Sequence, residues 1–191
     1  QSGGACATRG LYGKIIISGD AEFDSNQATN GGAISTESYG TVEINGGTFT
    51  GNVGYSAGGA TYIPDSAAAI MTKGYFADNK SNQDKGGAVY NAGTFIMKGE
   101  AQIDPSNDVY LAKNKFITIT DELNCSGHAA TITPEAYSEA QQVLDGAYAC
   151  KKYCPRSEPQ ICFRRMGKNR QRPLEADESR SEERRVGKEC R

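Results

Sequence analysis

Three carboxylates, those of Asp20, Glu22 and Asp24, alternate along one short segment and are the first side chains whose spacing suggests chemistry. Alternate residues of an extended strand point to the same side, so the three carboxylates would share one face. Several oxygen ligands on one face could bind Ca²⁺, and carboxylates beside a base could cleave a polysaccharide. Runs of charge usually face water, so we favour a solvated acidic face and keep this metal site as a weak candidate.

Two further candidates are weaker. The segment 78–84 reads Asp-Asn-Lys-Ser-Asn-Gln-Asp, which is similar to a Ca²⁺-binding loop, but Lys80 occupies a position that a ligand would need. His128 is the only histidine, and a zinc site requires about four ligands. We therefore predict a polar turn at 78–84, an ordinary surface position for His128, and neither a catalytic residue nor a cofactor.

The six cysteines do not define a site either. Cys6 falls at a position where equivalent segments carry Ile34, Thr61 or Val89, so we expect a small buried side chain. A disulfide between Cys125 and Cys150 would suit an exported protein, although the sequence does not assign the pairing.

The composition changes sharply after residue 153. The chain has 191 residues and a net charge of −2; residues 1–153 carry 10 basic and 16 acidic side chains, and residues 154–191 carry 11 and 7. Residues 180–190 read Arg-Ser-Glu-Glu-Arg-Arg-Val-Gly-Lys-Glu-Cys, which looks like a translated sequencing adapter. We therefore interpret 154–191 as a non-native or disordered tail. The nearly neutral balance disfavours nucleic-acid binding, and no apolar run approaches the roughly 18 residues of a membrane-spanning helix.

Residues 1–110 contain an internal repeat. The triplet Gly-Gly-Ala begins at Gly3, Gly31, Gly58 and Gly86, at spacings of 28, 27 and 28 residues. Three copies also contain Phe-x-x-Asn, and the fourth has Ile103 and Ser106 at these two positions. The residues that define the repeat most clearly are Gly31, Gly32, Phe49, Asn52, Gly58, Gly59, Phe76, Asn79, Gly86 and Gly87.

This period predicts an all-β fold, a right-handed parallel β-helix of about five coils. Short strands separated by Gly, Asn, Asp and Ser cannot bury their apolar faces alone, but they can when successive coils stack. The phenylalanines and Ile103 would then form an internal stack, and the asparagines a ladder at a turn. A β-sandwich of hairpins would explain the strands, but it does not explain the fixed period.

The last coils lack the triplet. We assign 1–135 to the β-helix and 136–153 to a C-terminal cap, with a short helix over 136–144 because Ala, Glu and Gln follow Pro134. Such a cap would cover the open end of the solenoid.

The combination of Gly-Gly-Ala-Ile at 31–34 and Phe-x-x-Asn at 49–52 resembles the repeats of polymorphic outer-membrane proteins, which are bacterial autotransporter adhesins with β-helical passengers. The resemblance covers about residues 3–148. It implies an extracellular or cell-surface location associated with the bacterial outer membrane, further β-helix coils in the parent chain, and host protein or glycan as the partner.

From the residues and this resemblance we expect a non-catalytic surface module that acts as an adhesin. The tyrosines at positions 39, 55, 62, 90 and 110 could form a binding face or merely cover a half-buried rim, and we favour the second. The alternatives are a fragment of a carbohydrate-active β-helix enzyme, which would need carboxylates and Arg9 or a lysine aligned on adjacent coils, and a structural spacer.

Overall fold

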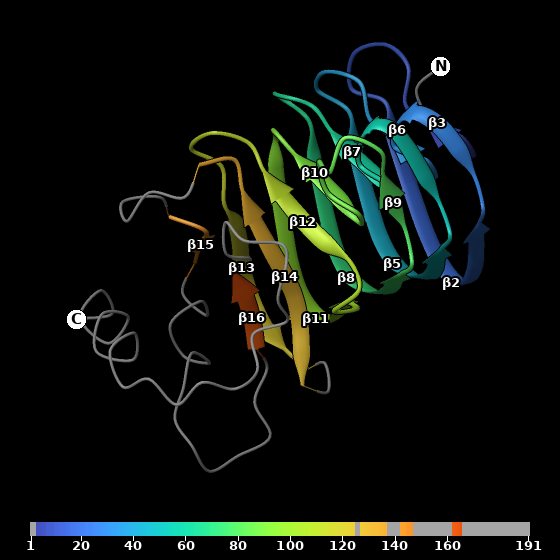
Figure 1. The fold of residues 1–191 in the computed structure, drawn as a ribbon. Helices are drawn as coiled ribbons and strands as arrows, with labels where there is room; N and C mark the ends of the chain where they lie inside the picture. Colours follow the sequence, from blue (N-terminus) through green and yellow to red (C-terminus); the bar gives the residue numbers. More distant parts are fainter. Residues whose placement is uncertain (1–2, 125–126, 137–141, 147–161, 166–191) are drawn as a thin grey trace, which may run out of the picture.

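The computed structural model describes residues 3–124, 127–136, 142–146 and 162–165, and within these residues every regular element is a strand. The strands form a β-solenoid of about five turns, confirming the predicted fold class. Figure 1 shows the coils stacked along one axis, from the blue strands near the N-terminus to the orange and red strands. The described residues contain no helix that could cross a membrane.

Sheet 1 contains the strand that follows each Gly-Gly-Ala corner. Its strands pair in parallel in the order β1-β4-β7-β10-β12-β14-β16. Their bounds are β1 Cys6–Ala7, β4 Ile34–Ser35, β7 Thr61–Ile63, β10 Val89–Asn91, β12 Asp108–Leu111, β14 His128–Pro134 and β16 Cys162–Arg165.

Sheet 2 contains the longest strand of each coil, and it carries most of the core. Its order is β15-β13-β11-β8-β5-β2, again parallel. Its strands are β2 Lys14–Asp24, β5 Thr41–Thr50, β8 Ala68–Ala77, β11 Thr94–Ile103, β13 Ile117–Leu123 and β15 Leu144–Asp145. The Ser, Gly and Asp residues near position 20 predicted a turn between two short strands, but β2 runs through them with a register shift between Gly19 and Glu22.

Sheet 3 was not predicted, because its segments read as polar turns. It contains β3 Gln27–Asn30, β6 Val53–Ala57 and β9 Lys80–Ser81, and it ends at β9. Backbone hydrogen bonds between coils form these strands whatever their side chains are, as when Val53 N donates to Asn26 O at 2.8 Å.

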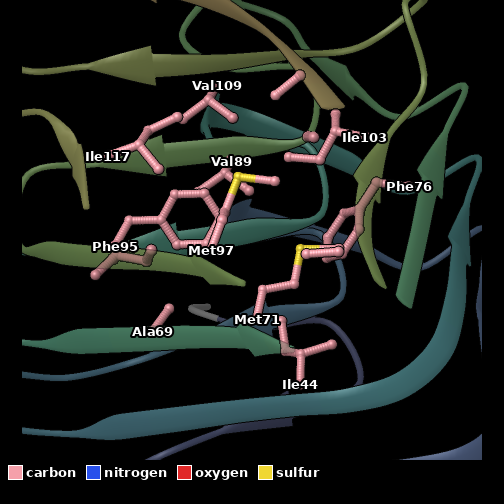
Figure 2. Packing of buried hydrophobic residues seen from close by; sticks show 14 of the residues in the cluster. Ile44, Ala69, Met71, Phe76, Val89, Phe95, Met97, Ile103, Val109 and Ile117 are labelled. Atoms are coloured by element: carbon pink, nitrogen blue, oxygen red, sulfur yellow. The ribbon is translucent and has the colours of Figure 1, made fainter. Parts of the chain in front are cut away.

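The core is built from residues that lie above one another in successive coils. One inward row of sheet 2 runs Ile17, Ile44, Met71, Met97 and Ile119, and the equivalent row of sheet 1 runs Cys6, Ile34, Thr61, Val89, Val109 and Ile132. Figure 2 shows Met71, Phe76, Met97 and Ile103 packed between the sheets. Alternate strand residues face inward, so each coil buries one apolar set against the next.

The Gly-Gly corners allow the coils to approach closely. Gly58 has φ +64°, a conformation that residues with a Cβ rarely adopt. Its neighbour Gly59 lies so close to the next coil that an added Cβ would overlap the carbonyl oxygen of Gly87. The first glycine of the pair is thus required by the turn, and the second by the contact between coils.

The predicted C-terminal cap is described only in part. Residues 137–141 and 147–153 of the cap lie outside the described residues. The predicted helix is wrong at its last residue, Leu144, which forms strand β15 with Asp145 beside β13. Pairing with the open edge of sheet 2 supplies these backbone groups with partners. Within the expected tail, Cys162–Arg165 form β16 beside β14, and the remaining tail lies outside the described residues.

Candidate functional site

Asp20, Glu22 and Asp24 are all exposed on β2, but a register shift between Gly19 and Glu22 interrupts the regular alternation at Asp20. The residues of the neighbouring coil that are in register with Glu22 and Asp24 are neither acidic nor basic. Glu22 is in register with Thr48 and Asp24 with Thr50. The hydroxyl of Thr50 donates to Asp24 Oδ1 at 2.9 Å, and the hydroxyl of Ser25 donates to Oδ2 at 3.0 Å. No group of three acidic, histidine or cysteine side chains suited to a metal occurs among the described residues.

The other candidates also have local structural roles. The segment 78–84 contains β9 and a turn in which Asp84 N donates to Ser81 O at 3.2 Å. His128 Nε2 lies 3.1 Å from the hydroxyl oxygen of Thr131 on the same strand. Cys6 is a half-buried free thiol, and Cys125 and Cys150 lie outside the described residues.

The predicted phenylalanine stack is present in the interior. The rings of Phe23 and Phe49 have centroids 4.7 Å apart, those of Phe49 and Phe76 are 4.2 Å apart, and both pairs are nearly parallel. Ile103 is in register with Phe76 and extends the row into the fourth coil. Stacked rings bury large apolar areas and fix the register of adjacent coils.

The asparagine ladder is also present, with one member that the sequence reading misplaced. Asn26, Asn52 and Asn79 are joined by side-chain hydrogen bonds, and the amide nitrogen of each donates to the Oδ1 of the next. The fourth member is Asn107 rather than Ser106, because Asn79 Nδ2 donates to Asn107 Oδ1 at 2.8 Å. The segment 103–107 is one residue longer than Phe-x-x-Asn. This extra residue in the sequence could have identified Asn107 as the ladder member.

The outward tyrosines form an ordered row on sheet 1. Tyr62, Tyr90 and Tyr110 are in register and half-buried, and their rings stack with centroid separations of 5.1 and 5.5 Å. Burial raises the pKa of the Tyr90 hydroxyl above its usual value, and the nearby Tyr62 and Glu135 add to this. The row presents phenol hydroxyls and ring edges on the outer face of sheet 1, and the rings also cover the strands beneath them.

Two other exposed tyrosines link neighbouring coils. The hydroxyl of Tyr55 donates to Gln27 Oε1 at 2.5 Å, and that of Tyr75 donates to Asp104 Oδ2 at 2.6 Å. The second bond holds the pKa of the Asp104 carboxyl below its usual range and raises the pKa of the Tyr75 hydroxyl. These contacts connect the coils on the outer surface.

A comparison with protein families gives one match: residues 20–37 match the Chlamydia polymorphic membrane protein (Chlamydia_PMP) repeat. No curated protein and no solved structure matches the chain. The matched segment runs from β2 through β3 and the first Gly-Gly-Ala corner that follows Phe-x-x-Asn. The chain is thus a β-helical repeat protein whose repeat resembles that of the polymorphic membrane proteins, and this similarity indicates a membrane-associated surface protein.

Proposed function

We infer that this chain is a non-catalytic interaction module of an exported bacterial protein, which presents the outer faces of the solenoid to a host protein or glycan. The observation that carries the proposal is the match of residues 20–37 to a repeat of polymorphic membrane proteins, within a stack where that repeat sets the register. Glu22 and Asp24 are in register with threonines rather than with catalytic partners, which favours this reading over a β-helix enzyme.

The solenoid has physical properties that suit display. Backbone groups of adjacent coils pair with one another, so the outer residues are held on a rigid frame and bind with little loss of conformational entropy. The tyrosine row on sheet 1 offers amphipathic side chains, which are favoured in interfaces. Variable segments, which lie between the asparagine ladder and the next corner, can change without disturbing the stack.

The first coil also supports the expectation of further coils. Asn26 Oδ1 accepts no hydrogen bond from the described residues, whereas Asn52 Oδ1 accepts from both the backbone and the side chain of Asn26. Phe23 is only half-buried and packs against Phe49 on one face. A preceding coil of the same kind would supply an asparagine donor and a second ring contact, so we propose such a coil as the partner of this end.

The proposal is tested by adhesion. Fluorescent beads coated with the full chain are incubated with cultured epithelial cells, and beads coated with albumin serve as the control. We expect saturable binding that free chain competes away. Binding no greater than that of the albumin beads would overturn the adhesin role and favour a structural spacer.

A further inference from the structure

The solenoid narrows after its third coil. In the second and third coils, five and six residues separate the ladder asparagine from the next Gly-Gly pair, at 53–57 and 80–85. After Asn107 the chain enters β12 at once, so the fourth coil has no residues to form another strand of sheet 3. Sheet 3 therefore ends at β9 while sheets 1 and 2 continue.

The missing strand leaves a cleft of about 210 Å³, which we call the step cleft. The residues that matter for its chemistry are Lys80, Ser81, Asp84, Gly87, Ser106 and Asp108. The packing at Gly87 reflects the same step. A Cβ added at Gly59 would overlap the next coil, whereas one added at Gly87 would find its nearest atom 3.1 Å away.

One wall of the step cleft is an open strand edge. Lys80 N donates to Asn52 O at 2.8 Å and Asn82 N donates to Gly54 O at 3.0 Å, so both residues bond toward the preceding coil. Successive residues of a parallel strand direct their backbone groups to opposite neighbours. The N–H of Ser81, which lies between them, is therefore directed toward the place where a fourth strand would lie.

The floor of the cleft is rigid. Asn79 and Asn107 are buried, and Asn107 Nδ2 donates to Asn79 O at 2.9 Å. Asp108 accepts a hydrogen bond from Gly87 N on Oδ1 at 2.6 Å, which fixes the orientation of its carboxylate. A site held by such bonds loses little entropy when it binds a ligand.

The groups around the cleft offer both donors and acceptors. Lys80 and the N–H of Ser81 donate, whereas the carboxylates of Asp84 and Asp108 accept. Two carboxylates against one ammonium disfavour an anion such as phosphate. A neutral molecule with adjacent hydroxyls can donate to the carboxylates and accept from the ammonium and the N–H. The volume is below the roughly 300–1,000 Å³ of sites for drug-sized ligands, so the cleft fits one small unit.

We propose that the step cleft binds a single neutral sugar residue of a glycan, with its hydroxyls between Asp84 and Asp108 on one side and Lys80 and the Ser81 N–H on the other. This inference rests on the proposed function and names the glycan-binding site within it. The site arises from the change in coil length and not from the repeat motif itself.

The test is a titration of the ¹⁵N-labelled full chain with glucose, galactose, mannose and N-acetylglucosamine, followed by amide chemical shifts. At least one sugar should shift the amides of Ser81 and Gly87. The variants Asp84→Asn and Lys80→Met should each weaken that binding about tenfold, since each removes the charge from one hydrogen-bonding partner of the sugar. Both positions are exposed, and Asn tolerates the positive φ of Asp84, so the variants should fold.

The controls are Lys113→Met and Asp20→Asn, which make the same changes at exposed positions away from the cleft. Both should bind the sugar as the unchanged chain does. The proposal is overturned if no sugar shifts Ser81 and Gly87, or if the cleft variants bind as well as the controls. Bead adhesion by the cleft variants at the level of the unchanged chain would reject the cleft and leave the proposed function standing.

Discussion

Replacing the buried Asn79 by alanine should destabilise the solenoid far more than the same change at the end of the ladder. Asn79 Nδ2 donates to Phe49 O and to Asn107 Oδ1, both at 2.8 Å. Its Oδ1 accepts from the backbone N and from the Nδ2 of Asn52, at 3.0 and 2.8 Å. Four hydrogen bonds at about 1 kcal/mol each give a loss of about 4 kcal/mol in the free energy of unfolding.

The matched control is Asn26→Ala, which removes the same atoms but only one side-chain hydrogen bond, to Asn52 Oδ1 at 3.0 Å. Its expected cost is about 1 kcal/mol, which leaves a difference of about 3 kcal/mol between the two variants. Urea unfolding of the full chain, followed by circular dichroism, measures both values. Equal losses for Asn79→Ala and Asn26→Ala would refute the ladder as a source of stability.

The ladder should also couple the stability effects of neighbouring asparagines. The side chains of Asn52 and Asn79 share one hydrogen bond, from Nδ2 of Asn52 to Oδ1 of Asn79 at 2.8 Å, so the double variant Asn52→Ala/Asn79→Ala should cost about 1 kcal/mol less than the two single losses added together. Additive losses would show that the two side chains act independently.

Three further predictions test the corner, the outer surface and the open end. Gly58→Ala should lower the urea midpoint more than Gly19→Ala, because both have φ near +65° but only a Cβ at Gly58 would overlap Thr61 O; equal shifts would contradict the packing argument. Tyr75→Phe should raise the pKa of the Asp104 carboxyl in an NMR titration. The pKa of Asp104 is lower in the folded than in the unfolded state, so its carboxylate stabilises the fold above the unfolded pKa, and this stabilisation is lost as pH falls through the folded pKa. The stability of Tyr75→Phe should therefore differ less between neutral and acid pH than that of the unchanged chain. Inserting a second copy of 31–57 before Gly3 should raise the urea midpoint, whereas a scrambled copy should not.

Most of the structure that could be predicted from the sequence follows from the repeat. The spacing of Gly-Gly-Ala predicts the coil length, and the position of Phe49 within it predicts the ring stack that the structure contains. These features depend on residue type directly, because only glycine fits the corner and a large apolar side chain is needed to fill that place in the core.

The features that were missed depend on backbone pairing and coil length instead. Strand β9 is Lys-Ser, which has no strand-like side-chain pattern, yet it pairs because β6 offers an open edge beside it. The displacement of the ladder from Ser106 to Asn107 results from one extra residue in the fourth coil. The step cleft follows from the residues that are missing after Asn107, and a motif-based reading has no pattern by which to find it.

The parallel register of the coils determines which side chains lie inside and which lie on each outer surface. A crystal structure of the full chain measures this register most directly. We expect Phe23, Phe49 and Phe76 in one internal stack. Tyr62, Tyr90 and Tyr110 should form a parallel row on the outer face of sheet 1. Antiparallel hairpins that pair consecutive strands, with these phenylalanines apart, would contradict the parallel register.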